Sequence, residues 1–392
     1  MDDQRHLQQA QGQNNASTLF GVEHIPWNNQ IRNLLDPLRP SHLDGGYLEV
    51  FEGLAQQGLV SNFRGFADQL LMAMDGTYYF SSQTIHCQNC LRRQTAHGQT
   101  LYYHRAITPV SVCPGRPEVI PLPPEFLVPQ DGHDKQDCER VAGKRWIDQH
   151  AKQVAPHGVP LLGDDLSSNQ PLCALALHKG VNFIFVCKPD SHPKLDERVA
   201  FWQAHDAVKE EENRRFNGRF TEVLRMRSLN DVALRSGKDA LSVHWGEITV
   251  VHASTGEQLY DNSCITNHRL NAANVAEVAQ AGRGRWKIEN ENNNVLKTKG
   301  YHIEHNLGHG KTSLAAFLLS LNLLAFLFHT VLEWCDDTYA LLRQVLARRQ
   351  TFFDDIRALT RSMVFDSWHH LMHFMIRGLE LEAKLEAKLN TS

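Results

Sequence analysis

Three carboxylate residues stand where a folded chain could bring them together. Asp75 directly follows the apolar run 66–74, Asp164 follows the shorter run 159–162 and one glycine, and Glu289 lies in a stretch with helical periodicity. Carboxylates at strand ends can meet at one edge of a sheet, and a helix that crosses the edge can add a third. Because such a cluster repels itself unless cations fill it, these residues predict a Mg²⁺ site.

The chemistry of such a site would be phosphodiester cleavage. Two Mg²⁺ ions, for which Mn²⁺ can substitute, polarise the phosphate, activate an attacking water or 3′-hydroxyl, and stabilise the leaving oxygen. Two positions have alternatives, because Asp165 adjoins Asp164 and Glu291 lies two residues beyond Glu289. Helix residues two apart point in different directions, so only one glutamate can face the metals. We favour Asp164 and Glu289, although spacing alone in a chain with 44 acidic residues favours ordinary surface acids.

A string of residues around Glu289 supplies further context. The residues at 285–289 are Arg-Trp-Lys-Ile-Glu, and Leu-Lys follows at 296–297. Here the chain resembles the DDE transposases of bacterial cut-and-paste insertion sequences. The signature helix of that family has the pattern Tyr-x2-Arg-x3-Glu-x6-Lys, in which the Glu is catalytic. The Arg-to-Glu spacing is the family's, and the runs that end at Asp75 and Asp164 resemble its first and second aspartate motifs.

The resemblance covers about residues 66–334, and it is specific because three motifs occur in the family's order. Two positions depart from the pattern. Gly282 stands where the family has its Tyr, so a phosphate-contacting hydroxyl is missing there, and Lys297 follows Glu289 by eight residues instead of seven. The second departure leaves open whether a displaced Lys297 keeps the family's role or Glu291 is the ligand.

The resemblance implies an α/β fold, namely an RNase H-like mixed sheet with flanking helices, a β-rich insertion, and helical N- and C-terminal parts. It also implies a transposase that hydrolyses DNA and transfers strands, with Asp75, Asp164 and Glu289 as catalytic residues and Mg²⁺ ligands. The implied partners are terminal inverted repeats, target DNA and further copies of the chain in a homodimer or larger assembly, in the cytoplasm at the nucleoid. The alternatives are a nuclease without strand transfer and a transposase-derived DNA-binding protein that no longer cuts.

Basic residues near the glutamate motif are expected to contact DNA. Arg285, Lys297 and Lys299 are the candidates for phosphate contacts, whereas Lys287 is expected on a solvated face. The net charge of −4 argues against a protein that coats DNA everywhere. Charge is uneven, however, because residues 267–311 carry seven Lys and Arg against four Glu.

A second metal site is suggested by cysteine spacing. Cys87 and Cys90 form a CxxC pair, and the remaining ligands of a structural Zn²⁺ would come from His97, His104 or Cys113. The alternative is a pair of unliganded thiols in a hairpin, since no second CxxC occurs. Disulfides are not expected, because the chain does not begin with a basic segment followed by an apolar run.

The elements that would position these residues follow from periodicity and turn signals. Helices are expected at 28–38, 44–59, 134–154, 195–216 and 272–299, and strands at 66–74, 101–112, 119–122, 159–162, 182–187, 220–227, 240–252 and 258–266. This order predicts a helical N-terminal region (1–65) that could bind DNA, the first part of the catalytic domain (66–189), a β-rich insertion (190–270), the glutamate helix with a core helix (271–334), and a helical C-terminal region (335–392).

One apolar segment, 313–334, is nearly long enough to span a membrane. It is interrupted by Ser320, Asn322 and His329, it stands alone, and it follows the glutamate helix. We therefore expect a buried core helix and no membrane partner.

Overall fold

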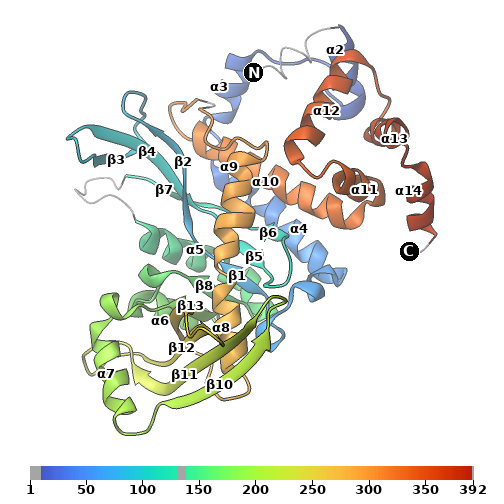
Figure 1. Ribbon diagram of the computed structural model, residues 1–392. Helices are drawn as coiled ribbons and strands as arrows, with labels where there is room; N and C mark the ends of the chain where they lie inside the picture. The colour runs from blue at the N-terminus through green and yellow to red at the C-terminus, as the bar shows by residue number, and fades with distance from the viewer. Residues whose placement is uncertain (1–9, 130–137, 307, 391–392) are drawn as a thin grey trace. The chain divides into compact units, whose positions relative to one another are not determined.

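The computed structural model describes residues 10–129, 138–306 and 308–390. The chain forms two compact units, whose elements are labelled in Figure 1. Unit 1 comprises Met1–Gly45, Tyr79–Tyr103 and Asn294–Ser392, and unit 2 comprises Gly46–Tyr78 and His104–Asn293.

Unit 2 contains a nine-stranded mixed sheet. Its strands are β1 (Leu71–Ala73), β5 (Val110–Val112), β6 (Val119–Pro121), β8 (Pro160–Gly163), β9 (Asn182–Val186), β10 (Lys209–Phe216), β11 (Thr221–Ala233), β12 (Ser242–His252) and β13 (Gln258–Thr266). Their order across the sheet is β10-β11-β12-β13-β9-β8-β1-β5-β6. β1, β8 and β9 are parallel neighbours, and the other neighbouring pairs are antiparallel. The three parallel strands are short, apolar and almost completely buried, as strands covered on both faces must be.

Unit 2 also contains helices, several of which pack on this sheet, as the sequence predicts. They are α4 (Asp44–Gln56), α5 (Glu139–Val154), α6 (Gln170–His178), α7 (Pro193–Gln203), α8 (Val275–Arg283) and the π-helix η7 (Ile288–Asn293). α6 and α8 both pack on β9, and α5 packs on α6. The start of α6 is set by Asn169, whose side chain accepts a hydrogen bond from the Leu172 N–H at 3.1 Å. The mixed α/β class is therefore as expected.

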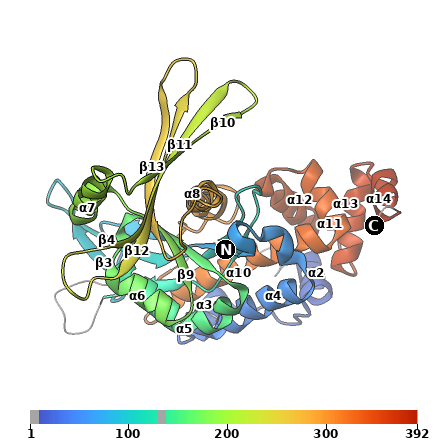
Figure 2. The same ribbon diagram turned by 90° about the horizontal axis from the view of Figure 1, so that it is seen from below.

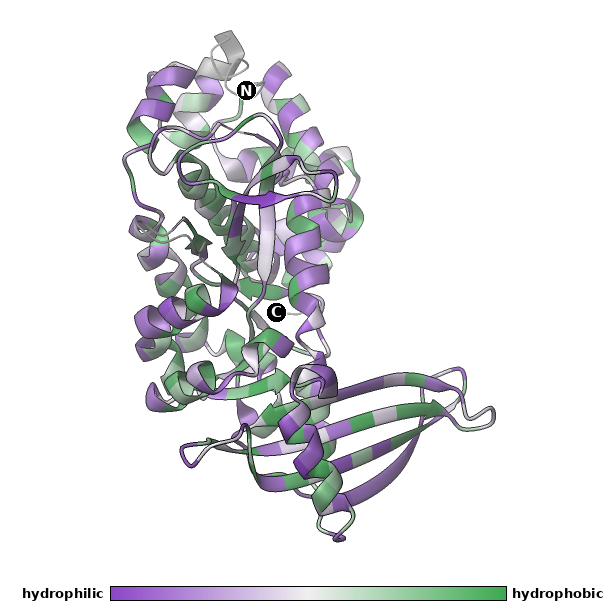
Figure 3. Ribbon diagram, turned by 90° about the vertical axis from the view of Figure 1, so that its left-hand side faces the viewer, coloured by the Kyte–Doolittle hydropathy of each residue, from purple (hydrophilic) through white to green (hydrophobic). Residues whose placement is uncertain are grey.

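The β-rich segment after β9 extends the same sheet. Cys264 of β13 pairs with Val186 of β9, so β10–β13 continue the hydrogen-bonded network of the shorter strands. Beyond these shared positions the strands form two hairpins, which project away from the rest of the sheet (Figure 2). Hydrophilic and hydrophobic residues alternate along them (Figure 3), the pattern of a sheet with one covered face.

The helix expected at 195–216 is wrong in its second half. α7 ends at Gln203, and residues 209–216 form β10, which pairs along its whole length with β11. Lys and Glu favour helices, but the Asn217-Gly218 turn returns the chain at once, with Gly218 at φ +97°. A cross-strand ion pair between Arg215 and Glu222, at 2.8 Å, adds to the pairing. Strand pairing overrides local propensity here.

A second sheet was not expected from the sequence. It contains β2 (Gly76–Ser82), β3 (Leu91–Gln94), β4 (Thr100–Ile107) and β7 (Glu125–Leu127), with β4 between β2 and β3 and also paired with β7. The run expected as strand at 101–112, in which Pro109 suggests a strand end or bulge, divides there into β4 and β5, and β5 begins in the other sheet. The boundary between the units runs through β2 and β4.

Unit 1 is mainly helical. Its helices are α2 (Ala10–Phe20), α3 (Asn28–Leu35), α9 (Asn294–Thr298), α10 (Leu314–Cys335), α11 (Asp337–Val345), α12 (Arg349–Ser362), α13 (Trp368–Gly378) and α14 (Glu382–Leu389). A core that includes Phe352, Phe365 and Leu371 joins α2 to the C-terminal helices. Asn15 fixes this contact, because its amide donates to the Thr360 and Met363 carbonyls at 2.7 Å each.

α10 is the apolar helix of the sequence. It has the length and composition to cross a membrane, but 44% of its most apolar window is buried within the structure. Leu319, Leu323 and Leu327 are among its buried residues. Part of this helix is therefore buried, as expected, and a single helix of this kind is weak evidence for a membrane span.

Candidate functional site

Asp75 and Asp164 lie at the carboxyl ends of two neighbouring strands in unit 2. β1 and β8 are parallel, with Ala73 opposite Leu162. Each aspartate stands two residues beyond this pair, so the register places them at the same level of the sheet edge. Both carboxylates line one small pocket. The expectation that the sheet would bring these two aspartates together is therefore fulfilled by strand register.

Asp75 is held by its neighbours on three sides. Its Oδ1 accepts a hydrogen bond from the Gly76 N–H at 2.8 Å, and its Oδ2 is 3.2 Å from Nη1 of Arg285. Its backbone carbonyl accepts from the Thr108 N–H at 3.1 Å. The side chain is 23% exposed, so it is sheltered but reachable by solvent and ions.

Asp164 and Asp165 face different surroundings. Asp164 Oδ1 accepts from the Ser167 hydroxyl at 3.2 Å, and the residue lines the pocket. Asp165 Oδ1 accepts from the Lys188 N–H at 2.7 Å, which fastens the turn after β8 to the end of β9. The glycine before them is required by space, because a Cβ at Gly163 would lie 2.5 Å from that of Ser167.

A third acid in the pocket was missed by sequence reasoning. Glu139, in the first turn of α5, lines the pocket with Asp75 and Asp164 and forms an ion pair with Arg105. Gly76 leaves the space that the Glu139 carboxylate occupies. A glutamate in the first turn of a helix has an ordinary explanation in the helix dipole, so its position in the sequence carries no functional signal.

The acids of this pocket disfavour each other's ionised forms. Burial raises the pKa of the Asp75 carboxyl, Arg285 and the Gly76 N–H lower it, and the charge of Asp164 raises it again. Burial likewise raises the pKa of Glu139, Arg105 opposes that effect, and the charges of Asp75 and Asp164 add to it. A divalent cation in the pocket would relieve this repulsion.

Glu289 is exposed on η7 and does not line the pocket, and Glu291 is half-buried. Arg285, which contacts Asp75, precedes Glu289 by about one helical turn. The end of η7 is anchored in the same region, since Asn293 Oδ1 accepts from the Thr108 hydroxyl at 2.8 Å. The turn before η7 therefore contacts Asp75 directly, through Arg285, and the last residue of η7 contacts Thr108, whose N–H bonds the Asp75 carbonyl, whereas Glu289 itself is exposed.

The π-helix bears on the unusual spacing after Glu289. A π turn, with its i to i+5 hydrogen bonds, takes up more residues than an α turn. Residues 288–293 form such a turn and α9 continues from residue 294. A separation of eight residues across a π turn therefore corresponds to a smaller one on a regular helix, which is a physical reason for the late position of Lys297.

The basic residues near the motif differ from one another. Lys287 is buried, and its Nζ donates to the Arg116 carbonyl, so the expected solvated position is wrong. Its alkyl stem and ammonium are held inside unit 2 because a backbone acceptor is available there. In unit 1, Lys297 forms an ion pair with Glu304 at 2.9 Å, and Lys299 is exposed.

The CxxC pair belongs to a cluster that could bind a metal ion. Cys87, Cys90, His104 and His309 each offer one ligand atom, and these atoms all lie within 4.8 Å of one another. Within the described ranges it is the only group of three or more His, Cys, Asp or Glu side chains that meets this distance. Of the ligands considered from the sequence, His104 is in the cluster, whereas His97 and Cys113 are not. His309 was not foreseen, because nothing local links it to a cysteine 219 residues away.

Comparison with models of known protein families finds no match, and comparison with curated proteins finds none either.

Proposed function

We propose that the chain is a DDE-type transposase, which cuts and rejoins DNA in a Mg²⁺-dependent reaction at the ends of an insertion sequence. The observation that carries the proposal is the pairing of Asp75 and Asp164 at the ends of adjacent parallel strands, with Arg285 on Asp75. Arg285 belongs to the motif on which the family resemblance depends.

In this proposal Asp75, Asp164 and Glu289 bind the reaction's cations. Mg²⁺ is usually held in proteins by one or two carboxylates together with waters and substrate phosphates, so two converging aspartates are a sufficient beginning for a site. When bound, a pair of such ions would polarise the phosphodiester and stabilise the leaving oxygen, and Mn²⁺ could substitute. Glu289 would complete the ligand set from η7 by turning its exposed side chain toward Asp75.

The chain's own groups would position the DNA strand. Arg285, which now contacts Asp75, would exchange that contact for a scissile-strand phosphate once cations neutralise the carboxylate. The exposed Lys299 and, after release from Glu304, Lys297 are further proposed phosphate contacts. Hydrolysis would leave a 3′-hydroxyl on the element. Attack of that hydroxyl on a target phosphodiester would form a new P–O3′ bond, break the target's own P–O3′ bond and release the target's 3′-oxygen, which takes up the proton lost by the attacking hydroxyl.

Further parts of the proposal follow from the family resemblance. The sheet of unit 2 would be RNase H-like, β10–β13 would be the insertion, and the N-terminal helices would bind DNA. The active form would be a homodimer or larger assembly on the inverted repeats, in the cytoplasm at the nucleoid. The softer ligands of the Cys and His cluster suit Zn²⁺ rather than Mg²⁺.

The test uses DNA fragments that carry the sequences flanking the gene, incubated with the purified chain, Mg²⁺ and a supercoiled target plasmid. A transposase cuts at the fragment ends and joins them to the plasmid. Cutting without joined product would establish the nuclease instead. Mg²⁺-independent binding without any cutting would establish the DNA-binding protein and overturn the proposed activity.

A further inference from the structure

The CxxC segment and a loop far away in the sequence meet inside unit 1. Cys87 and Cys90 enclose a tight turn in which the Cys90 N–H donates to the Cys87 carbonyl at 3.2 Å. The Cys90 sulfur lies 3.8 Å from Nδ1 of His309, which precedes α10. Two chain segments therefore converge on one point that is lined by sulfur and nitrogen atoms.

The spacing of these atoms matches a tetrahedral ion. Zinc binds sulfur at about 2.3 Å and imidazole nitrogen at about 2.0–2.1 Å, so two sulfurs would lie about 3.8 Å apart and a sulfur and a nitrogen about 3.6 Å apart. The Cys87 and Cys90 sulfurs are 3.7 Å apart, and the Cys90 sulfur to His309 distance is 3.8 Å. A disulfide would need a separation of about 2.05 Å.

Strand register brings in the fourth ligand. Leu91, next to Cys90, pairs with Tyr103 in the β3–β4 hairpin. His104 directly follows Tyr103, the last residue of unit 1 in this stretch, on the same strand, and its side chain is 4% exposed. Because the strands are antiparallel, Cys90 and His104 occupy the next positions along the two strands, and the β3–β4 hairpin itself brings them together.

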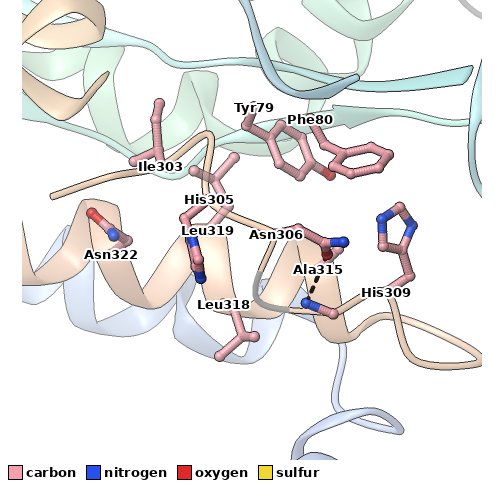
Figure 4. A pocket seen from close by; sticks show the side chains of 11 residues that line it. Tyr79, Phe80, Ile303, His305, Asn306, His309, Ala315, Leu318, Leu319 and Asn322 are labelled. Carbon is pink, nitrogen blue, oxygen red and sulfur yellow. Dashed lines mark hydrogen bonds between the residues drawn. The ribbon is translucent and has the colours of Figure 1, made fainter. Parts of the chain in front are cut away.

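The His309 ring is oriented by an aromatic neighbour. The rings of His309 and Phe80 have centroids 4.1 Å apart and an interplanar angle of 84°. Figure 4 shows the His309 ring beside that of Phe80, at one end of a pocket that Tyr79 and Ile303 also line. Packing of this kind fixes a ligand's direction before an ion binds.

The turn between the cysteines is already docked on the same loop. The Gln88 amide donates to the Lys311 carbonyl at 2.7 Å, and the Asn89 amide donates to the Thr312 carbonyl. On the other side, Asp36 at the end of α3 accepts from the N–H groups of Lys311 and Thr312 at 2.7 and 2.9 Å. The loop before α10 is thus held between two segments, and the Cys and His cluster lies at one of the two attachments.

We propose that Cys87, Cys90, His104 and His309 bind one structural Zn²⁺. Two cysteines and two histidines make a full tetrahedral set, which leaves no position for water or substrate, so the ion would not take part in a reaction. It would join the β3–β4 hairpin to the loop before α10. The proposal is independent of the proposed transposase activity, because none of the four ligands belongs to the acidic pocket.

The experiment measures metal content of the full chain after purification without chelators. We expect one zinc per chain in the wild type and loss of that zinc in Cys87→Ser and His309→Asn. Cys113→Ser and His97→Asn are matched controls, because both residues lie near the hairpin in sequence but outside the cluster, and both should keep the metal. His104→Asn should lower zinc retention, which separates His104 from His97 as the fourth ligand.

A spectrum of the wild type keeps the proposal testable even where a variant fails to fold. Co²⁺ exchanged into a site with two thiolates and two imidazoles gives intense visible bands of tetrahedral cobalt and a thiolate charge-transfer band. Folded wild-type protein without stoichiometric zinc and without these bands would overturn the site. Zinc that stays in His309→Asn but leaves Cys113→Ser would overturn the ligand set. Either result would leave DNA cleavage by the acidic pocket unaffected.

Discussion

Replacing Asp164 with asparagine should abolish DNA cleavage while leaving the fold intact. Asparagine has the same shape as aspartate, and its side-chain oxygen can still accept the hydrogen bond that Ser167 now donates at 3.2 Å. The substitution removes one negative charge next to Asp75. Because the charge of Asp164 raises the pKa of Asp75, the pKa of Asp75 should fall in this variant. Stability without divalent ions should therefore stay level or rise.

The magnitude follows from ligand linkage. At a Mg²⁺ concentration of about 100 times the Kd, binding stabilises the folded state by about 2.7 kcal/mol. If loss of one carboxylate weakens affinity about 100-fold, the remaining stabilisation is about 0.4 kcal/mol. For a domain of about 150–250 residues, 1 kcal/mol moves the Tm by about 2–4 °C. The Mg²⁺-dependent rise in Tm should thus shrink from roughly 5–10 °C to about 1 °C.

Thermal unfolding with and without Mg²⁺, together with the cleavage assay, measures both effects. Asp165→Asn is the matched control. Asp165 is also an aspartate and is next to Asp164 in the chain, but its carboxylate accepts a hydrogen bond from the Lys188 N–H instead of lining the pocket. It should keep both the Mg²⁺-dependent rise in Tm and cleavage. If Asp164→Asn retained both and Asp165→Asn lost them, the register argument that joins Asp75 to Asp164 would be refuted.

Three further predictions concern the remaining residues of the site. Glu289→Gln should abolish cleavage and Glu291→Gln should not; the reverse result would make Glu291 the third ligand. Glu139→Gln should flatten the pH dependence of Tm measured without metal. The pKa values of Asp75 and Glu139 are raised in the folded protein, so the folded state is stabilised at low pH, and this stabilisation is lost as pH rises through the folded-state pKa values. A variant that keeps the wild-type pH profile would show that Glu139 does not titrate with this pocket. Arg285→Gln should weaken DNA binding equally on all sequences and reduce the slope of log affinity against log salt by about 0.9, and an unchanged slope in a salt titration would exclude a phosphate contact.

Much of the framework could be predicted from local sequence. The apolar runs before Asp75 and Asp164 predicted strands, and β1 and β8 lie at the ends of those runs. The strand expected at 66–74 is wrong in its first part, because Phe66–Asp68 form a 3-10 helix and only Leu71–Ala73 pair in the sheet. The helix expected at 134–154 corresponds to α5 (Glu139–Val154) over the described residues, while 134–137 lie outside them, and the core helix at 313–334 corresponds to α10. These features depend on the periodicity and composition of neighbouring residues, and those are properties that a sequence displays directly.

Tertiary contacts decided the rest. Glu139 enters the pocket because the first turn of α5 comes to lie beside Gly76, and Lys287 is buried because the Arg116 carbonyl is within its reach. Residues 209–216 are a strand because β11 pairs with them. His309 meets Cys90 across 219 residues. Partners so distant in the chain leave no periodic trace near either residue, so the sequence alone determined which side chains stand at the ends of the elements, and only the folded chain determined which of them meet.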